Sequence, residues 1–225
     1  MFFICLFGAW IQAQEPKELN IIVVANYDGQ QIEKNNWYHS KRNDSIQLTK
    51  VKFYLTNFRL LLTTGPLLPI EEKNLLIDGF IINKIKLNFK VPKNTKDLLL
   101  ACDLGVDKKY NMSGANSGDL DPVNGMFWSW QSGYINFKIE GMSPSCKTRK
   151  NKFQFHIGGY QTPHQTKRSL SFKLETGVVN NLVIFIELSK FFDALELGTV
   201  NQLTTAGAKA SQMANRFQKI FSSYE

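Results

Sequence analysis

Hydrophobic and polar residues alternate along most of the chain, in short stretches separated by turn residues. In residues 84–91, apolar Ile85, Leu87 and Phe89 alternate with lysine and asparagine, which is the period of a half-buried β-strand with one wet face. Residues 45–62 are long enough for two strands or for one bent strand. Comparable stretches predict further strands at 20–26, 97–104, 133–140, 152–157, 169–174 and 181–188.

The C-terminal region follows a different period. Met213, Phe217, Ile220 and Phe221 recur at spacings of three and four, which predicts one amphipathic helix that packs on the sheets. No internal repeat or linker divides the chain. The pattern therefore predicts an all-β fold, an antiparallel Greek-key β-sandwich with one C-terminal α-helix, as a single domain over residues 20–225.

The chain begins with the apolar run MFFICLFGAWI and becomes polar at Gln12. This pattern is typical of a secretory signal peptide, and we expect residues 1–13 to be removed by cleavage after Ala13. Cys5 lacks the small residues that precede a lipidated cysteine. At roughly ten residues the run is also shorter than the about 20 that span a bilayer. We therefore expect a periplasmic or secreted protein that does not span a membrane.

The chain has 27 Lys and Arg against 19 Asp and Glu, a formal net charge of +8. Its lysines are dispersed, and the one cluster, in residues 147–152, has the composition of a solvated loop, so we do not expect nucleic-acid binding. Cys102 and Cys146 remain after export to an oxidising compartment. They could form a disulfide, stay as two buried thiols, or bind a metal, and their spacing leaves these alternatives open.

Aromatic residues are concentrated in GMFWSWQSGYINFKIEG, residues 125–141. A strand period places Trp128 and Trp130 on one face. Both indoles could be core, because tryptophan buries a large area, although two neighbouring indoles also suit glycan stacking or an electron-accepting relay. In the strand that follows, we expect residues 135, 137 and 139 to point inward and Asn136, Lys138 and Glu140 to point outward.

Histidine is scarce, and His39, His156 and His164 are the whole set. His156 ends a predicted strand just before a Gly-Gly turn, and His164 follows in the same connection. A lone histidine is often only a satisfied polar group. Imidazoles without a nearby carboxylate or thiolate motif nevertheless favour copper over calcium or magnesium, and the thioethers of Met112 and Met126 could complete a Cu(I) site.

Two long connections, residues 107–124 and 158–166, are rich in turn residues. A sandwich displays functional groups on such loops, because its sheets hold them rigidly. Asp119 and Asp121 lack the further ligands of an EF-hand, so we expect them to form turns. The chain has no GxSxG, HExxH or CxxC motif and no Gly-rich phosphate loop, so the sequence does not predict an enzyme.

Several blocks resemble the MbnP-like family of exported proteins, and most closely its Bacteroidetes members. They are FYLTNFRL at 53–60, LGVD at 104–107, GDLDPVNGMFWSWQSGYINFKIEG at 118–141, FHIGGYQTP at 155–163 and a C-terminal AxxMANRFxxxF segment. The resemblance covers nearly all of the mature chain. The family is named for a periplasmic copper-binding protein associated with methanobactin genes.

This resemblance implies an exported β-sandwich that binds copper. In characterised relatives, a partner di-haem enzyme of the cytochrome c peroxidase type converts a tryptophan to kynurenine, which joins histidines in a copper site. Trp128 and Trp130 match the family's motif tryptophans, and His156 matches its FHxG histidine. Methanotroph relatives carry an Asn-His pair upstream, where this chain has Asn111 and Met112. The site is therefore expected to be altered, with Met112 as a Cu(I) ligand, or absent.

Two functions stay open from the sequence. The first is a copper-binding partner and substrate of a di-haem peroxidase, with His156 as a ligand and Met112, His164 or His39 as co-ligands. The second is a β-sandwich interaction module that binds a glycan or a protein through exposed aromatic side chains such as Trp37, without a metal.

Overall fold

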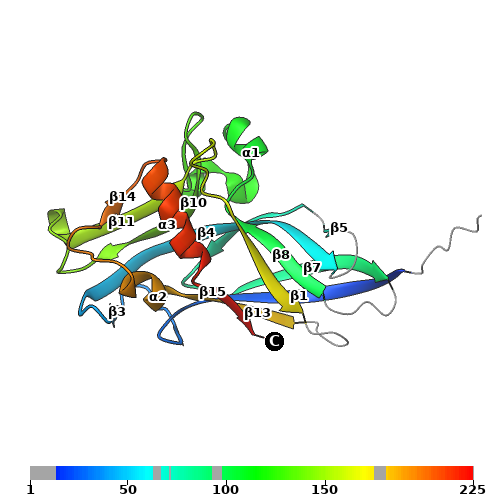
Figure 1. The fold of residues 1–225 in the computed structure, drawn as a ribbon, viewed down its shortest axis with the longest axis horizontal. Coiled ribbons are helices and arrows are strands. Elements are labelled where there is room, and N and C mark those ends of the chain that lie inside the picture. The colour runs from blue at the N-terminus through cyan, green and yellow to red at the C-terminus, as the bar shows by residue number, and fades with distance from the viewer. Residues whose placement is uncertain (1–13, 63–66, 71, 93–97, 175–180, 225) are drawn as a thin grey trace, which may run out of the picture.

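The computed structural model describes residues 14–62, 67–70, 72–92, 98–174 and 181–224. The expected signal peptide, residues 1–13, lies outside these residues. Figure 1 shows an elongated molecule, with strands β1 and β13 in its lower part and the helix α1 near the top. In the described part, no helix is long and apolar enough to cross a membrane.

The smaller sheet has the order β15-β13-β1-β2, with β7 also paired to β1. Asp28 and Gly29 have positive φ values of 49° and 77° and form the tight turn from β1 to β2, as the sequence predicts. Strand β1 begins earlier than predicted because it also pairs with β7. The strands are β1 (Gln14–Tyr27), β2 (Gln30–Gln31), β7 (Asn83–Pro92), β13 (Asn181–Glu187) and β15 (Phe221–Tyr224).

The larger sheet has the order β12-β8-β4-β10-β11-β14 and is organised by the long strand β4. Strands β10 and β8 follow one another along one edge of β4, and β3, β6 and β5 pair along the other edge. The small strand β9 pairs with β10. The strands are β3 (Trp37–His39), β4 (Ser45–Leu62), β5 (Leu67–Pro69), β6 (Asn74–Asp78), β8 (Leu98–Leu104), β9 (Phe127–Ser129), β10 (Gly133–Met142), β11 (Lys152–Gly158), β12 (Arg168–Leu174) and β14 (Gln202–Leu203).

Strand β4 decides between the two interpretations of residues 45–62, because it is one strand with a bulge. Its register with β8 shifts between Thr56 and Arg59. Asn57, inside this shift, has a φ of 50°, and asparagine tolerates this left-handed conformation better than most residues. The bend lies where β10 gives way to β8, so residues 105–132, which connect these two strands, leave the sheet at this point.

One core lies between the sheets, and the helix α3 closes it. The ring of Phe217 stacks on Phe137 of β10, with 3.9 Å between ring centroids, and on Phe191, with 4.4 Å.

The helices are α1 (Lys108–Met112), α2 (Leu188–Asp193), α3 (Ala208–Gln218) and the 3-10 turns η1 (Gly118–Leu120), η2 (Pro122–Asn124) and η3 (Arg149–Asn151).

The predicted C-terminal helix is confirmed as α3, but it ends earlier than its apolar period suggests. Phe221 begins β15, which pairs with β13, and its ring contacts Phe53 edge-on at 5.5 Å. A helix and a short strand can both deliver an apolar side chain to the same core, so spacing alone could not locate the end of the helix.

The all-β sandwich is confirmed, with two departures from antiparallel pairing. Strands β1 and β13 run parallel, with Asn20 opposite Asn181, and β11 and β14 run parallel, with Gln154 opposite Gln202. Parallel neighbours require a long crossover. The chain provides one by building most of the larger sheet between β1 and β13.

The structure has two separate buried thiols in place of the disulfide considered for Cys102 and Cys146. Cys102 lies in β8 beside the C-terminal half of β4, whereas Cys146 follows β10 beyond the start of β4. Roughly 30 Å of β4 lies between these positions at about 3.3 Å per residue, far more than the about 4.4–6.8 Å that a disulfide allows between Cα atoms. The structure therefore contradicts a disulfide between Cys102 and Cys146. Burial raises the pKa of the Cys102 thiol to about 12.

Candidate functional site

The candidate residues gather around the outer face of the β10–β11 pair. Phe153, Phe155 and Ile157 of β11 are buried in the core. Because side chains alternate along a strand, Gln154, His156 and Gly158 lie on the opposite face. In the register, Lys138 of β10 is directly opposite His156.

His156 is held by Glu140 of β10. Its Nε2 atom lies 2.8 Å from Oε1 of Glu140, and the two side chains are only 14% and 18% exposed. The second carboxylate oxygen of Glu140 lies 3.1 Å from Nζ of Lys50. The hydrogen bond with His156 and the neighbouring Lys50 lower the pKa of Glu140 to about 2, against the opposing effect of its burial. Glu140 is therefore an ionised, anchored partner of His156.

Lys138 lies on the outer face of β10, as predicted, but both it and Asn136 are buried. The ammonium group of Lys138 donates to the carbonyl of Gly125, just before the MFWSW segment. Burial lowers the pKa of Lys138. The Asn136 side chain accepts from the Val106 amide at 2.9 Å and donates to the Thr166 hydroxyl at 2.8 Å. The two long connections thus fold over this face of β10. The alternation of residues along a strand does not reveal this burial, because it comes from segments that are distant in sequence.

Trp128 lies on the same face as His156. A methyl group at Gly158 would lie 2.8 Å from Cζ3 of Trp128 and would also meet the backbone oxygen of Tyr134, so the indole rests against bare backbone at this position. Gly158 is two residues from His156 along β11, or roughly 6.6 Å at about 3.3 Å per residue. The fold therefore places the half-buried Trp128 on the face of β11 that carries His156, against a residue two positions along the strand.

This packing predicts that Gly158→Ala will displace the Trp128 ring. We expect a loss of about 2 kcal/mol in unfolding free energy, because the added methyl overpacks a filled site, together with a shift of the tryptophan fluorescence maximum. Gly198→Ala is the control, because a methyl there meets only the Ser145 oxygen at 3.7 Å. Equal stabilities and unchanged spectra for both variants would contradict the contact.

Trp130 does not share the face of Trp128. Strand β9 ends at Ser129, and Trp130 lies in the following turn with 72% of its surface exposed. The predicted common strand face is therefore wrong. Trp37 is also exposed, but it pairs with Gln47 and so lies beyond the Met142 end of β10, whereas Trp130 precedes its start. Trp37 and Trp130, the exposed indoles of the described residues, thus lie toward opposite ends of β10 and do not form one platform for a glycan.

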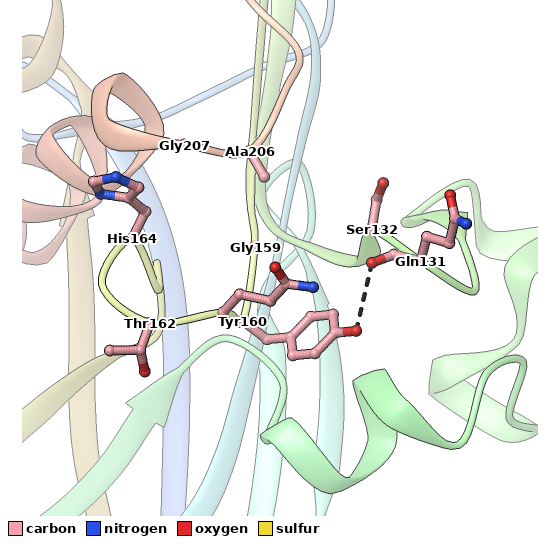
Figure 2. Close-up of a pocket in the computed structure, with 9 residues that line it drawn as sticks. Gln131, Ser132, Gly159, Tyr160, Thr162, His164, Ala206 and Gly207 are labelled. Atoms are coloured by element: carbon pink, nitrogen blue, oxygen red, sulfur yellow. Dashed lines mark hydrogen bonds between the residues drawn. The ribbon is translucent and has the colours of Figure 1, made fainter.

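His164 lies in a pocket of about 290 Å³ near the turn that carries Trp130. Figure 2 shows Tyr160 reaching toward Gln131, with its hydroxyl donating to the Gln131 carbonyl at 3.4 Å, and His164 on the side of Gly207. The imidazole of His164 is exposed. The pocket therefore connects residues 159–164 with the turn after β9 and the start of α3.

His39 is distant from His156. It pairs with Ser45 at the start of β4, and its Nδ1 lies 3.3 Å from the Ser45 hydroxyl. His156 lies opposite Lys138, which lies opposite Lys52. The intervening part of β4 puts roughly 20 Å between the two histidines, at about 3.3 Å per residue.

Met112 ends α1 and is 66% exposed. The neighbouring Asn111 is buried and accepts from the Tyr134 amide at 2.8 Å, so it fixes α1 against the start of β10. Met126, the other thioether considered, is fully buried in a small cluster with Tyr134 and Leu120. Within the described residues, no three His, Cys, Asp or Glu side chains gather as a metal site. The structure thus places Trp128 and His156 on one face of β11, and His39 far from them.

The sequence missed the role of Glu140, because its contact with His156 depends on the register of β10 against β11. Asp119 and Asp121 behave as the turn formers that were expected. Asp121 caps η2 by accepting from the Val123 amide at 2.9 Å, and Asp119 accepts from the Leu76 amide at 2.8 Å.

Comparison with known proteins agrees with this architecture. The family model described as MbnP matches residues 16–213. The chain belongs to the MbnP family. The solved structure of MbnP from Methylosinus trichosporium is similar in fold, with a TM-score of 0.61 and 15% identity over 94% of this chain and 98% of that chain. No curated protein matches the chain. The MbnP family is linked to copper binding.

Proposed function

We propose that this protein is exported, binds copper, and is the partner and substrate of a di-haem enzyme of the cytochrome c peroxidase type that oxidises Trp128 to kynurenine. Membership of the MbnP family supports the link to copper. The observation that carries the proposal is that Trp128 rests on Gly158, beside His156 and on the same face of β11.

The residues present fit the chemistry of copper. The imidazole of His156 is a borderline donor that suits copper, and the thioether of Met112 is a soft donor that suits Cu(I). Opening of the indole ring of Trp128 would create an aniline nitrogen and a carbonyl, two donors that tryptophan lacks. Oxidation of Trp128 would thus add donors on the face of β11 that carries His156.

Trp130 has a different part in this proposal. Its indole is 72% exposed in the turn after β9, two residues from Trp128. An external haem protein can approach Trp130 directly, whereas Trp128 is half-buried. We assign Trp130 to the surface that meets the partner and Trp128 to the oxidised position. His164 lies near the same turn and is a weaker ligand candidate than His156, and His39 lies too far away to share an ion with it.

Peptide mass spectrometry of protein purified from its own cells tests this assignment. We expect the peptide that contains FWSWQ to have gained one oxygen and lost one carbon, with the change located at Trp128. Protein made in a host without the di-haem partner is the control and should carry intact indoles. An unmodified native peptide, or a change confined to Trp130, would contradict the assignment, and native protein that binds no copper above a buffer control would remove the copper function.

A further inference from the structure

The contact between Glu140 and His156 constrains which nitrogen of the imidazole is free. The Nε2 atom of His156 lies 2.8 Å from Oε1 of Glu140, and both side chains are largely shielded from water. An ionised carboxylate only accepts hydrogen bonds, so Nε2 must carry the proton and donate it.

Lys50 holds the second oxygen of the Glu140 carboxylate. Its ammonium group lies 3.1 Å from Oε2 of Glu140, and Glu140 pairs with Lys50 across the β10–β4 ladder. An ammonium group only donates. The carboxylate is therefore held between two donors, one at each of its oxygens.

A neutral imidazole carries one proton, so a proton on Nε2 leaves the lone pair on Nδ1. In the part of the chain that the structure describes, Nδ1 of His156 makes no hydrogen bond. Metal-binding histidines commonly donate their second ring N–H to a carboxylate, which fixes the tautomer and the ring orientation.

We infer that Glu140 is a positioning residue that selects the Nε2–H tautomer of His156 and presents Nδ1 as the copper-binding atom. This inference rests on the proposed copper function, but the tautomer itself is a property of the metal-free protein. Lys50 has a supporting part, because it holds the carboxylate at the distance that His156 requires.

Glu140→Gln provides a test that preserves shape. Because the Lys50 ammonium only donates, it should attract the amide oxygen of the new side chain and turn its NH₂ group toward His156. That group donates, so Nε2 of His156 must then accept and the ring proton must move to Nδ1. The variant is thus expected to exchange the two tautomers and to block Nδ1.

The measurement is the ring ¹⁵N chemical shifts of histidine-labelled, metal-free protein at about pH 8, where an imidazole is neutral. We expect an Nε2–H tautomer for His156 in the wild type and an Nδ1–H tautomer in Glu140→Gln. The exposed His39 is the internal control, because its signals should not change. An Nδ1–H tautomer in the wild type, or the same tautomer in both proteins, would overturn the inference.

Copper titration of the same two proteins separates this inference from the proposed function. We expect the affinity of Glu140→Gln to fall by about 10–100-fold, the range for losing such an outer partner. Equal affinities in the two proteins would overturn the positioning role and leave copper binding intact. If the wild type shows the expected tautomer but binds no copper, the proposed function fails and the selection of the tautomer by Glu140 stands.

Discussion

Replacing His156 by alanine is expected to lower the copper affinity by at least about 100-fold, since loss of a direct ligand should cost no less than loss of an outer partner. His156 is the histidine that shares a face of β11 with Trp128, and in the described structure Glu140 is the side chain that hydrogen-bonds to it. The affinity for Cu(I) and for Cu(II) can each be measured by competition with a coloured chelator of known affinity.

His39→Ala is the matched control for this experiment. It removes the same side chain from an exposed strand that lies, by the register of β4, roughly 20 Å away at about 3.3 Å per residue. Its affinity should equal that of the wild type. His164→Ala tests the pocket near Trp130 and should have a small effect. A copper affinity that survives His156→Ala, or that falls equally in His39→Ala, would show that the ion binds elsewhere.

Local periodicity predicted most strands well, because each strand's burial pattern depends on its own residues. Alternation in residues 84–91 became β7, and the turn at Asp28 and Gly29 became the hairpin between β1 and β2. Where an element depends on a partner, the pattern was less informative. Phe221 fits a helical period, but it forms β15 because β13 offers an open edge.

The candidate site could be predicted only in part, because its contacts join segments that are distant in sequence. The motif pointed to Trp128 and His156, and the structure places them on one face. It could not show that Asn136 and Lys138 lie beneath two long connections, because this cover comes from residues near 106, 125 and 166. The sequence pattern also did not show that β9 ends at Ser129, so that Trp130 lies in the following turn and not on the strand face of Trp128. Such features follow from register and loop packing.

Glu140→Gln is also expected to lose stability in a way that depends on pH. The folded protein holds the pKa of Glu140 at about 2, well below its ordinary value of 4.5. A group with a lowered folded pKa stabilises the protein fully above its unfolded pKa, and this contribution disappears as the pH falls toward the folded pKa. A shift of this size corresponds to at most about 3 kcal/mol. Solvent screening and the contacts that the glutamine remakes reduce this, so the variant should be less stable by about 1 kcal/mol at neutral pH.

Urea unfolding of the wild type and Glu140→Gln at a series of pH values measures this difference. The difference in unfolding free energy should be constant above about pH 5, where this glutamate is ionised in both the folded and the unfolded protein. It should shrink as the pH falls from 4.5 toward 2. Glu33→Gln is the control, because Glu33 is exposed and its contacts with Tyr38 are made by its backbone. A Glu140→Gln difference that stays the same down to acid pH would mean that the ionised carboxylate between His156 and Lys50 does not contribute to folding. The loss would then come from the altered packing of the side chain alone.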